Sequence, residues 1–497
     1  MVRVTKGLVM RYDLLVVGSG PSGQKGAIAA AKLGKRVALV ERRSEDLGGV
    51  CLHTGTIPSK TMREAILYLS GYKHREVYKD RYVQKRKITM DDLRRKLDQV
   101  IAHETQVIQE YLDRNQVDLF SGEAQFVDAH TVQVTREKQT VRVAADKILV
   151  ACGTKPSRPS YIPFDGRTIF DSDELLQLEQ IPRSMIVIGA GVIGIEYAIM
   201  FATLGVEVTV VDGRERLLDF CDREIVDALM FHARSLGMVF RLGEDVVGID
   251  RLRKGLAAVR LESGKRLIAE TALFAAGRVG DTAALDLQAA GLTSDERGRL
   301  WCDENHRTWV PHIYGVGDVI GFPALASASM EQGRRAVCAM FDRPYVAYRN
   351  LPYGLYTIPE ISMIGKTEQQ LTTERVPYEV GVANFREIAR GQISGDENGL
   401  LKLLFHRETK ELLGVHCIGD TATEIIHIGQ AVMALGGTIE YFRDTVFNYP
   451  TMAEAYKVAA FNGLNKLDLE LLPRTDDELD LLSSIDELTE LCAGGTM

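Results

Sequence analysis

Three features are scarce or missing in this sequence, and each excludes a class of protein. No uninterrupted apolar run approaches the ~18 residues that a membrane-spanning helix needs, so we expect no membrane association. Basic residues are not in excess: 60 Lys and Arg stand against 68 Asp and Glu, a formal charge of −8 that argues against nucleic acid as a main partner. The first residues, Met1–Met10, lack the layout of a signal peptide.

Cysteine is present without any pairing pattern. The seven cysteines are an odd number at scattered positions, with neither metal-ligand spacing nor a disulfide framework. We therefore expect no bound metal and a protein of the reducing cytoplasm. The remaining composition, with 45% hydrophobic and 26% charged residues, is typical of a globular protein. A chain of 497 residues should form two to four domains.

A glycine-rich turn near the N-terminus carries the first functional signal. The apolar run Leu14–Val17 is typical of a buried strand, and the G-x-G-x-x-G turn Gly18–Gly23 follows it. A helix is expected over Gly26–Leu33, and the next strand, Arg36–Val40, ends in Glu41. Such a unit binds a dinucleotide, because the glycines let the backbone approach a pyrophosphate at the helix N-terminus. The expected contacts are Gly18, Gly20 and Gly23 to the phosphates and Glu41 to the ribose.

The same pattern recurs 171 residues later. Ser184–Ile188 predicts a strand, Gly189–Gly194 the turn, Ile195–Leu204 the helix, and Glu207–Val211 a strand that ends in Asp212. A single glycine turn could belong to an ordinary α/β domain, but a chance match would have to occur twice with the same spacing. The sequence therefore predicts two dinucleotide sites, the second formed by Gly189, Gly191, Gly194 and Asp212.

The segment Gly48–Lys60 resembles the redox segment of the flavoprotein disulfide reductases, G-G-x-C-x-x-x-G-C-x-P-S-K. Gly49 and Cys51 match that pattern, but Thr56 stands where the second cysteine would be. Cys51 thus has no local partner, and no dithiol can form here. Gly49, Cys51 and Thr56 are expected to lie by the flavin, with Cys51 either retaining thiol chemistry or serving as a small packed residue.

A second departure from the family pattern lies at Phe447–Glu454. Disulfide-reducing members read H-P-T-x-x-E here, and the His, oriented by the Glu, exchanges protons with the redox thiol. In this chain Tyr449 stands where that His would be, while Glu454 remains. A tyrosine, with a pKa of about 10, is a poor proton shuttle at neutral pH. Both departures argue against disulfide reduction.

Two further segments carry the resemblance, which covers about Tyr12 to Leu467. Ala151–Pro156 resembles the A-x-G-T-x-P end of the first pass through an FAD domain, and Leu273–Arg278 closes the second nucleotide unit in a similar way. Ile313–Asp318 resembles the second FAD signature, whose Asp bonds the ribityl chain; for Asp318 a helix N-cap before Ala324–Met340 is the alternative. The implied site residues are Gly153, Gly277 and Asp318.

The resemblance implies an α/β fold with two Rossmann-like dinucleotide-binding domains and an α+β C-terminal dimerisation domain. The FAD domain would be discontinuous, with the NAD(P) domain inserted into it. The expected boundaries are 1–160 and 278–345 for the FAD-binding domain, 161–277 for the NAD(P)-binding domain, 346–467 for the dimerisation domain and 468–497 for an acidic C-terminal tail. We expect this tail to be solvated or loosely docked, with a partner-binding helix as the alternative.

With Thr56 in place of the second cysteine and Tyr449 in place of the histidine, the chain resembles the Si-specific transhydrogenase branch of the family. That branch uses FAD to move a hydride between NADPH and NAD+ in a ping-pong cycle, so FAD is the implied cofactor, NAD and NADP the substrates, and a homodimer or larger homo-oligomer the assembly. Lys60 would lie beside flavin N5 and pair with Glu196, although a lysine in a helix's first turn is commonly a surface residue. The candidate catalytic residues are Lys60, Glu196, Tyr449 and Glu454.

The end of the second unit bears on nucleotide choice. The carboxylate of Asp212 accepts both ribose hydroxyls of NAD but repels the 2′-phosphate of NADP. Arg214 and Arg216 follow it, and a guanidinium binds a phosphate well, although solvated loop arginines are the alternative. Three other functions stay open: a dihydrolipoamide dehydrogenase-like disulfide reductase using Cys51 with a distant cysteine, an NADH diaphorase or oxidase, and an FAD-holding interaction protein.

Overall fold

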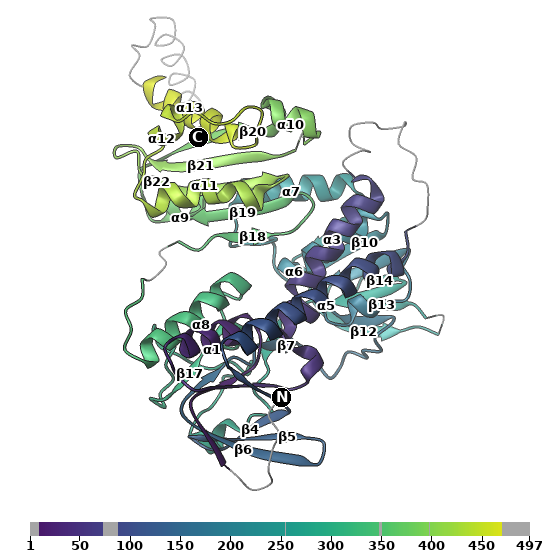
Figure 1. Cartoon of the computed structure of the whole chain (residues 1–497). Helices are drawn as coiled ribbons and strands as arrows, with labels where there is room; N and C mark the ends of the chain where they lie inside the picture. The colour runs from purple at the N-terminus through teal and green to yellow at the C-terminus, as the bar shows by residue number, and fades with distance from the viewer. Residues whose placement is uncertain (1–8, 73–87, 254, 347–349, 397, 470–497) are drawn as a thin grey trace, which may run out of the picture. The chain divides into compact units, whose positions relative to one another are not determined.

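The computed structural model describes residues 9–72, 88–253, 255–346, 350–396 and 398–469. The predicted acidic tail therefore lies almost wholly outside the described residues. The chain divides into two compact units, Met1–Glu360 and Ile361–Met497 (Figure 1). Among the helices of the described ranges, none has both the length and the apolar character required to cross a membrane.

The first unit is built around two largely parallel sheets, one for each glycine turn. The first sheet has the order β3-β2-β1-β6-β5-β4, with β17 paired in parallel to β6. Because β17 comes late in the chain, the polypeptide returns to this sheet after it has formed the second one. The strands are β1 (Val9–Val17), β2 (Val37–Glu41), β3 (Asp118–Ser121), β4 (Glu123–Asp128), β5 (Thr131–Arg136), β6 (Gln139–Val150) and β17 (Ile313–Gly315).

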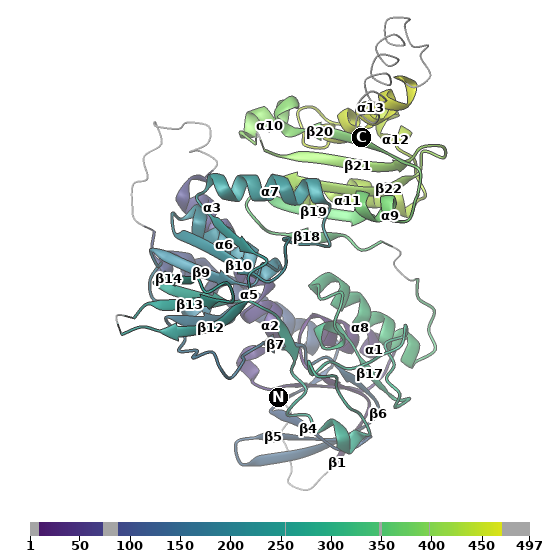
Figure 2. The ribbon, with the colours of Figure 1, turned by 180° about the vertical axis from the view of Figure 1, so that it is seen from behind.

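Two helices, α1 (Pro21–Lys32) and α8 (Ala326–Met340), lie side by side beside this sheet (Figures 1 and 2). Glycine permits their close approach: a Cβ on Gly333 would lie 2.2 Å from the carbonyl oxygen of Ser22. Leu14, Leu39 and other apolar side chains of the central strands are fully buried beneath them. The long helix α5 (Met90–Arg114) belongs to the same unit and opens with a capping box at Thr89.

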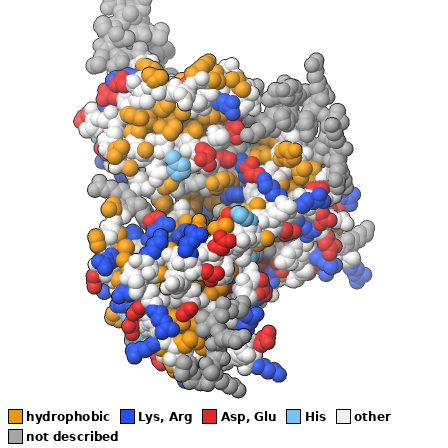
Figure 3. Space-filling model, viewed as in Figure 1, with side chains coloured by type: hydrophobic (Ala, Val, Ile, Leu, Met, Phe, Trp, Pro, Cys, Tyr) orange, Lys and Arg blue, Asp and Glu red, His pale blue; other side chains and the backbone are white. Residues whose placement is uncertain are grey.

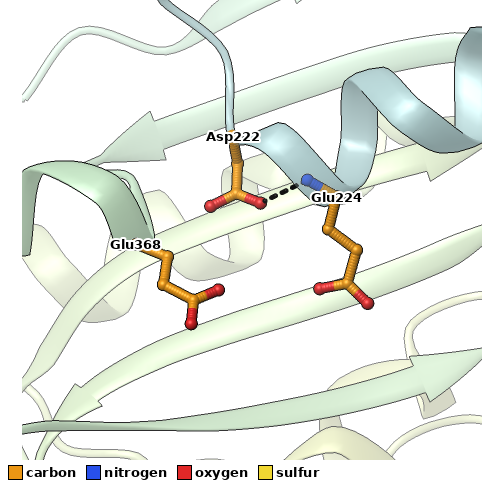
Figure 4. A group of neighbouring side chains, drawn as sticks. All are labelled: Asp222, Glu224 and Glu368. Carbon is orange, nitrogen blue, oxygen red and sulfur yellow. Dashed lines mark hydrogen bonds between the residues drawn. The ribbon is translucent and has the colours of Figure 1, made fainter. Parts of the chain in front are cut away.

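The second sheet has the order β11-β10-β9-β15-β8, and each of its pairings is parallel. Its central helix α6 (Val192–Thr203) is almost entirely buried, which agrees with its apolar sequence. Helix α7 (Arg223–Ser235) begins after Asp222, whose carboxylate accepts a hydrogen bond from the backbone N–H of Glu224 (Figure 4). The strands are β8 (Ile169–Asp171), β9 (Ser184–Ile188), β10 (Glu207–Asp212), β11 (Val239–Leu242) and β15 (Thr271–Phe274).

Smaller elements complete the first unit. The short helix α2 (Gly49–His53) and the start of the longer helix α3 (Thr56–Ser70) carry the segment that resembles the redox motif. The others are the antiparallel sheet of β12 (Val246–Arg251), β13 (Ala257–Leu261) and β14 (Arg266–Ala269), the pair β7 (Thr154–Pro156) and β16 (Arg278–Gly280), the short strand β18 (Tyr353–Leu355), and the 3-10 turns η1 (Ser44–Asp46), η3 (Leu175–Gln177), η4 (Leu287–Ala290) and η5 (Gly317–Ile320).

The second unit is an α+β layer. Its sheet has the strand order β19-β22-β21-β20. Helices α11 and α13 are joined by a hydrogen bond in which the Tyr456 hydroxyl donates to the carbonyl oxygen of Ile425 (2.9 Å). Lys402 of β21 is fully buried and pairs with Glu368. Figure 4 shows Glu368 at the start of α9. The elements are β19 (Glu360–Gly365), α9 (Glu368–Thr373), β20 (Tyr378–Asn384), η6 (Phe385–Glu387), α10 (Ala389–Ser394), β21 (Leu400–His406), β22 (Leu412–Gly419), α11 (Ala422–Ala434), α12 (Glu440–Asp444) and α13 (Glu454–Leu469).

Candidate active site

The first glycine turn packs tightly on one side and is open on the other. Gly18 has φ +106°, and a Cβ there would lie 2.4 Å from the carbonyl oxygen of Ala151. A Cβ on Gly23 would lie 1.9 Å from the carbonyl oxygen of Gly18, so a side chain is excluded at both positions. A Cβ on Gly20, by contrast, would meet nothing within 4 Å. The open side faces the start of α1, where free N–H groups can receive a pyrophosphate.

The second turn repeats this geometry. Gly189 has φ +104° and would place a Cβ 2.6 Å from the carbonyl oxygen of Ala275, and Gly194 would place one 2.0 Å from that of Gly189. Gly191 is open in the same way as Gly20. The residues of both turns therefore fit a bound dinucleotide, with the middle glycine leaving room for its phosphates.

Each turn is held to the acid at the end of the following strand. The backbone N–H of Ser19 donates to Glu41 (3.0 Å), and that of Ala190 donates to Asp212 (2.6 Å), across the same 22-residue separation. Burial alone would raise the pKa of Asp212, but hydrogen bonds from Arg214 and the Ala190 backbone outweigh it and hold that pKa below its usual value. Both acids lie where a ribose would follow the pyrophosphate.

Lys60 and Glu196 come together from separate helices. Lys60 lies in the first turns of α3 and Glu196 on α6, and the ammonium nitrogen is 2.7 Å from Oε2 of Glu196. The lysine side chain is 24% exposed and the glutamate 5%. The backbone N–H of Tyr356 donates to Oε1 of Glu196 (2.8 Å), and the Tyr356 ring centroid lies 4.8 Å from the Lys60 nitrogen. The predicted pairing of Lys60 with Glu196 is therefore present in the structure, and it holds a positive charge in a mostly buried place.

Cys51 is a free thiol on α2. Burial raises the pKa of this thiol above its ordinary value, and a hydrogen bond with Thr56 opposes that shift only in part. A protonated thiol is a poor nucleophile. All six cysteines in the described ranges are free. Gly49 begins this helix against the first turn, since a Cβ there would lie 3.0 Å from Cα of Gly20.

Asp318 lies in η5, and the N-cap alternative for it is wrong. Helix α8 begins at Ala326 and has Leu325 at its N-cap, so Asp318 is too far upstream to cap it. Burial raises the pKa of Asp318, while Arg278 and a hydrogen bond with Thr154 oppose the shift. The two predicted glycines that close the nucleotide units, Gly153 and Gly277, both have positive φ and would place a Cβ in open space.

Tyr449 and Glu454 belong to the second unit. Tyr449 precedes α13 and is 73% exposed. Glu454 is the first residue of α13, and its Oε2 is buried without a hydrogen-bond partner among the described residues. Their catalytic roles stay predictions.

Sequence reasoning missed two residues that shape the first unit's site. Tyr356 reaches Glu196 from 160 residues further along the chain, and no local pattern marks it. Arg278 of β16 donates to the Thr154 hydroxyl (2.9 Å) and to Asp173 (3.0 Å), which ties together the segments that close the two nucleotide units. The only available signal for Arg278 was its place directly after Gly277.

Comparison with known proteins identifies the family to which the chain belongs. The family model described as pyridine nucleotide-disulphide oxidoreductase matches residues 12–333, and the dimerisation domain of the same family matches 351–460. The chain is similar to the soluble pyridine nucleotide transhydrogenase of Mycobacterium bovis, with 54% identity over 461 residues, covering 92% of this chain and 98% of that protein. It is also similar to the protein of that name from Pectobacterium atrosepticum, with 47% identity over 464 residues and the same coverage.

Solved structures show the same fold. The HOCl-induced flavoprotein disulfide reductase RclA from Escherichia coli, as its Cu(II) complex, superposes with a TM-score of 0.81 at 27% identity, covering 90% of this chain and 99% of that one. LpdA from Mycobacterium tuberculosis has a TM-score of 0.84 at 24% identity, covering 91% and 99%. The predicted fold class and family resemblance are thus confirmed. The chain belongs to the pyridine nucleotide-disulphide oxidoreductase family, among its soluble pyridine nucleotide transhydrogenases.

Proposed function

We propose that this chain catalyses FAD-dependent hydride transfer between NADPH and NAD+, giving NADP+ and NADH, in a ping-pong cycle that uses no redox-active disulfide. Relatives of up to 54% identity over nearly the whole chain carry the name transhydrogenase. Two glycine turns of matching geometry supply places for a flavin dinucleotide and a nicotinamide dinucleotide.

The observation that carries the proposal is the Lys60–Glu196 pair, at the end of a segment, Gly48–Lys60, that has no second cysteine. Thr56 occupies the position at which the dithiol of a disulfide reductase would be completed, and Cys51 is a free thiol with a raised pKa. Among the described residues every cysteine is free, so electrons that entered on a bound flavin would have no disulfide there to pass to. A second nicotinamide at the same place is the simplest way for them to leave.

The cofactor is proposed to be held by the first nucleotide unit. Gly18, Gly20 and Gly23 form the phosphate turn, and the remaining contacts are assigned to Glu41, Gly49, Cys51, Thr56, Gly153 and Asp318. The flavin, when bound, supplies the hydride chemistry itself, accepting a hydride from one nicotinamide and returning it to another. Lys60, held in its pair with Glu196, would supply a fixed positive charge beside the flavin ring, where negative charge would develop during hydride transfer.

The substrates are proposed to bind at the second nucleotide unit, which lies within the first compact unit. Gly189, Gly191 and Gly194 would hold the pyrophosphate, and Gly277 would line the close of the unit. Asp212, Arg214 and Arg216 are assigned to the adenosine ribose. Tyr449 and Glu454 complete the set of candidate catalytic residues, and with Tyr449 in the histidine position the chain lacks a base for thiol chemistry.

The assembly is proposed to be a homodimer in the cytoplasm. A dimerisation-domain model matches 351–460, and large apolar side chains are exposed on the second unit (Figure 3). Exposed apolar side chains on a dimerisation domain suit an interface between two copies of the chain. The large ones exposed on this unit include Ile393, Leu435, Tyr441, Val446, Tyr449 and Phe461. The domain boundaries at 160, 277, 345 and 467 are retained as part of the proposal.

An anaerobic spectral titration tests the proposal. The FAD-loaded protein is mixed with NADPH in the absence of any acceptor, and NAD+ is then added. We expect NADPH to bleach the flavin absorbance and NAD+ to restore it with the formation of NADH. Flavin that NADPH cannot reduce, or that only oxygen or a quinone reoxidises, would instead assign the chain as an NADH diaphorase or oxidase. Flavin that stays oxidised with every nucleotide would indicate an interaction protein.

A further inference from the structure

The loop after β10 carries an ion pair of the second nucleotide unit that has no counterpart among the described residues of the first nucleotide unit. Arg214 closes a fork onto Asp212, with Nε 2.9 Å from Oδ1 and Nη2 2.9 Å from Oδ2. The backbone N–H of Arg214 also donates to Oδ1 (2.8 Å), and that of Ala190 donates to Oδ2 (2.6 Å). A carboxylate has about four acceptor positions, so these four bonds saturate Asp212.

The first nucleotide unit supplies an internal comparison. Glu41 stands at the position equivalent to Asp212 and accepts from Ser19 and from the backbone N–H of Arg42 (2.7 Å). Among the described residues, no guanidinium donates to Glu41: Arg42 bonds Asp281, and Arg43, the counterpart of Arg214, bonds Asp46. With three bonds accepted, Glu41 of the first nucleotide unit keeps an acceptor position for a ribose, whereas Asp212 of the second nucleotide unit has given its own to Arg214.

We propose that Arg214 is a selector that lets one site accept both nicotinamide nucleotides. The inference rests on the proposed function and assigns the discrimination to a single side chain with two positions. In the closed position, which the structure shows, Arg214 neutralises Asp212. In the open position it leaves Asp212 free.

The closed position suits NADP. Nη1 of Arg214 lies 3.9 Å from Asp219, beyond hydrogen-bond distance, and the side chain is 45% exposed. The guanidinium can thus bind a 2′-phosphate with its outer N–H groups while Nε and Nη2 stay on Asp212. The arginine then lies between carboxylate and phosphate, and the repulsion that Asp212 alone would exert is screened.

The open position suits NAD. Its ribose hydroxyls need the acceptor positions that Arg214 fills, so NAD binds only when the guanidinium swings into solvent. The Arg214 side chain is 45% exposed and can move into solvent, while the ribose hydroxyls take over its bonds to Asp212, which is 9% exposed, and so offset the loss of the pair. Arg214 thus helps one substrate and competes with the other, which a merely structural arginine would not do.

Calorimetric titration of the FAD-loaded protein with NADP+ and, separately, with NAD+ tests this without any catalytic readout. In Arg214→Ala we expect the dissociation constant for NADP+ to rise at least about tenfold, as befits loss of a charge-assisted bond. The constant for NAD+ should fall about two- to fivefold, because the competing pair is gone. In Asp212→Asn we expect the opposite changes. The dissociation constant for NAD+ should rise, and that for NADP+ should fall.

Arg43→Ala is the matched control, since it removes the equivalent arginine of the first nucleotide unit. It should leave both constants unchanged, whereas a shift as large as that of Arg214→Ala would overturn the assignment. So would weakening of both nucleotides by Arg214→Ala. Wild-type protein that binds NAD+ but not NADP+ would instead refute the proposed function, so the two failures are distinguishable. Arg216→Ala adds a contrast: a contact to the 2′-phosphate alone would weaken NADP+ without tightening NAD+.

Discussion

Replacing Lys60 with alanine tests the proposed role of its charge. The ammonium nitrogen lies 2.7 Å from Glu196 and the side chain is 24% exposed, so the charge is partly screened by water. Loss of one preorganised group that stabilises developing charge costs about 2.7–4 kcal/mol, or 10²–10³ in rate. Because of the exposure we expect the lower end, about a hundredfold slower flavin reduction by either NADPH or NADH.

Anaerobic stopped-flow measurement of flavin absorbance gives this rate directly for each nucleotide. FAD content should be unchanged in Lys60→Ala, since the residue is assigned to the reacting ring and not to the adenosine end. Lys60→Arg keeps a positive charge and should retain most of the rate. Reduction of Lys60→Ala at wild-type speed would refute the electrostatic role.

A second variant distinguishes the loss of the Lys60 charge at the flavin from a general loss of stability. Lys60→Ala leaves the Glu196 carboxylate, 5% exposed, with the backbone N–H of Tyr356 as its remaining hydrogen-bond partner, which should lower the thermal midpoint. Adding Glu196→Gln removes that unpaired charge and should restore the midpoint without restoring the rate. A double variant that recovers both would mean that the single variant was slow because it was disrupted.

Three further predictions concern other residues. Cys51→Ser should keep FAD and most transhydrogenase activity; a loss above about tenfold in kcat, roughly 1.4 kcal/mol, would show that the thiol is needed. Glu41→Ala should weaken FAD retention, measured as FAD lost on dilution, and a full complement of FAD in the variant would contradict the ribose assignment. Burial alone would raise the pKa of Asp281, but hydrogen bonds from Lys155 and Arg42 outweigh it and keep that pKa low. The folded state is thus stabilised above the unfolded pKa of about 3.9, and the thermal midpoint deficit of Asp281→Asn at pH 7 should vanish as the pH falls through the folded pKa.

The nucleotide-binding architecture could be predicted because its signals are local. The expected strand Ser184–Ile188 coincides with β9, and the helices α1 and α6 begin inside the turns that predict them. Glycines at fixed spacing report backbone constraints that neighbouring residues impose, so a single sequence is enough to find them.

The side-chain arrangement of the site could be predicted only in part. The resemblance supplied Lys60 with Glu196, which the structure places in contact. Tyr356 could not be found, because it reaches that pair only through the tertiary fold. The fork of Arg214 onto Asp212 was missed for another reason: a loop guanidinium can take several positions, and sequence does not say which one the fold selects.

Initial rates of thio-NAD+ reduction by NADPH without oxygen test the central claim most directly. With both nucleotides varied, a ping-pong cycle through one flavin predicts parallel double-reciprocal lines and one thio-NADH formed for each NADPH consumed. Cys51→Ser should give the same pattern. Intersecting lines would contradict the ping-pong cycle, and NADPH consumption that needs a disulfide or oxygen would contradict an electron path that enters and leaves through nicotinamides alone.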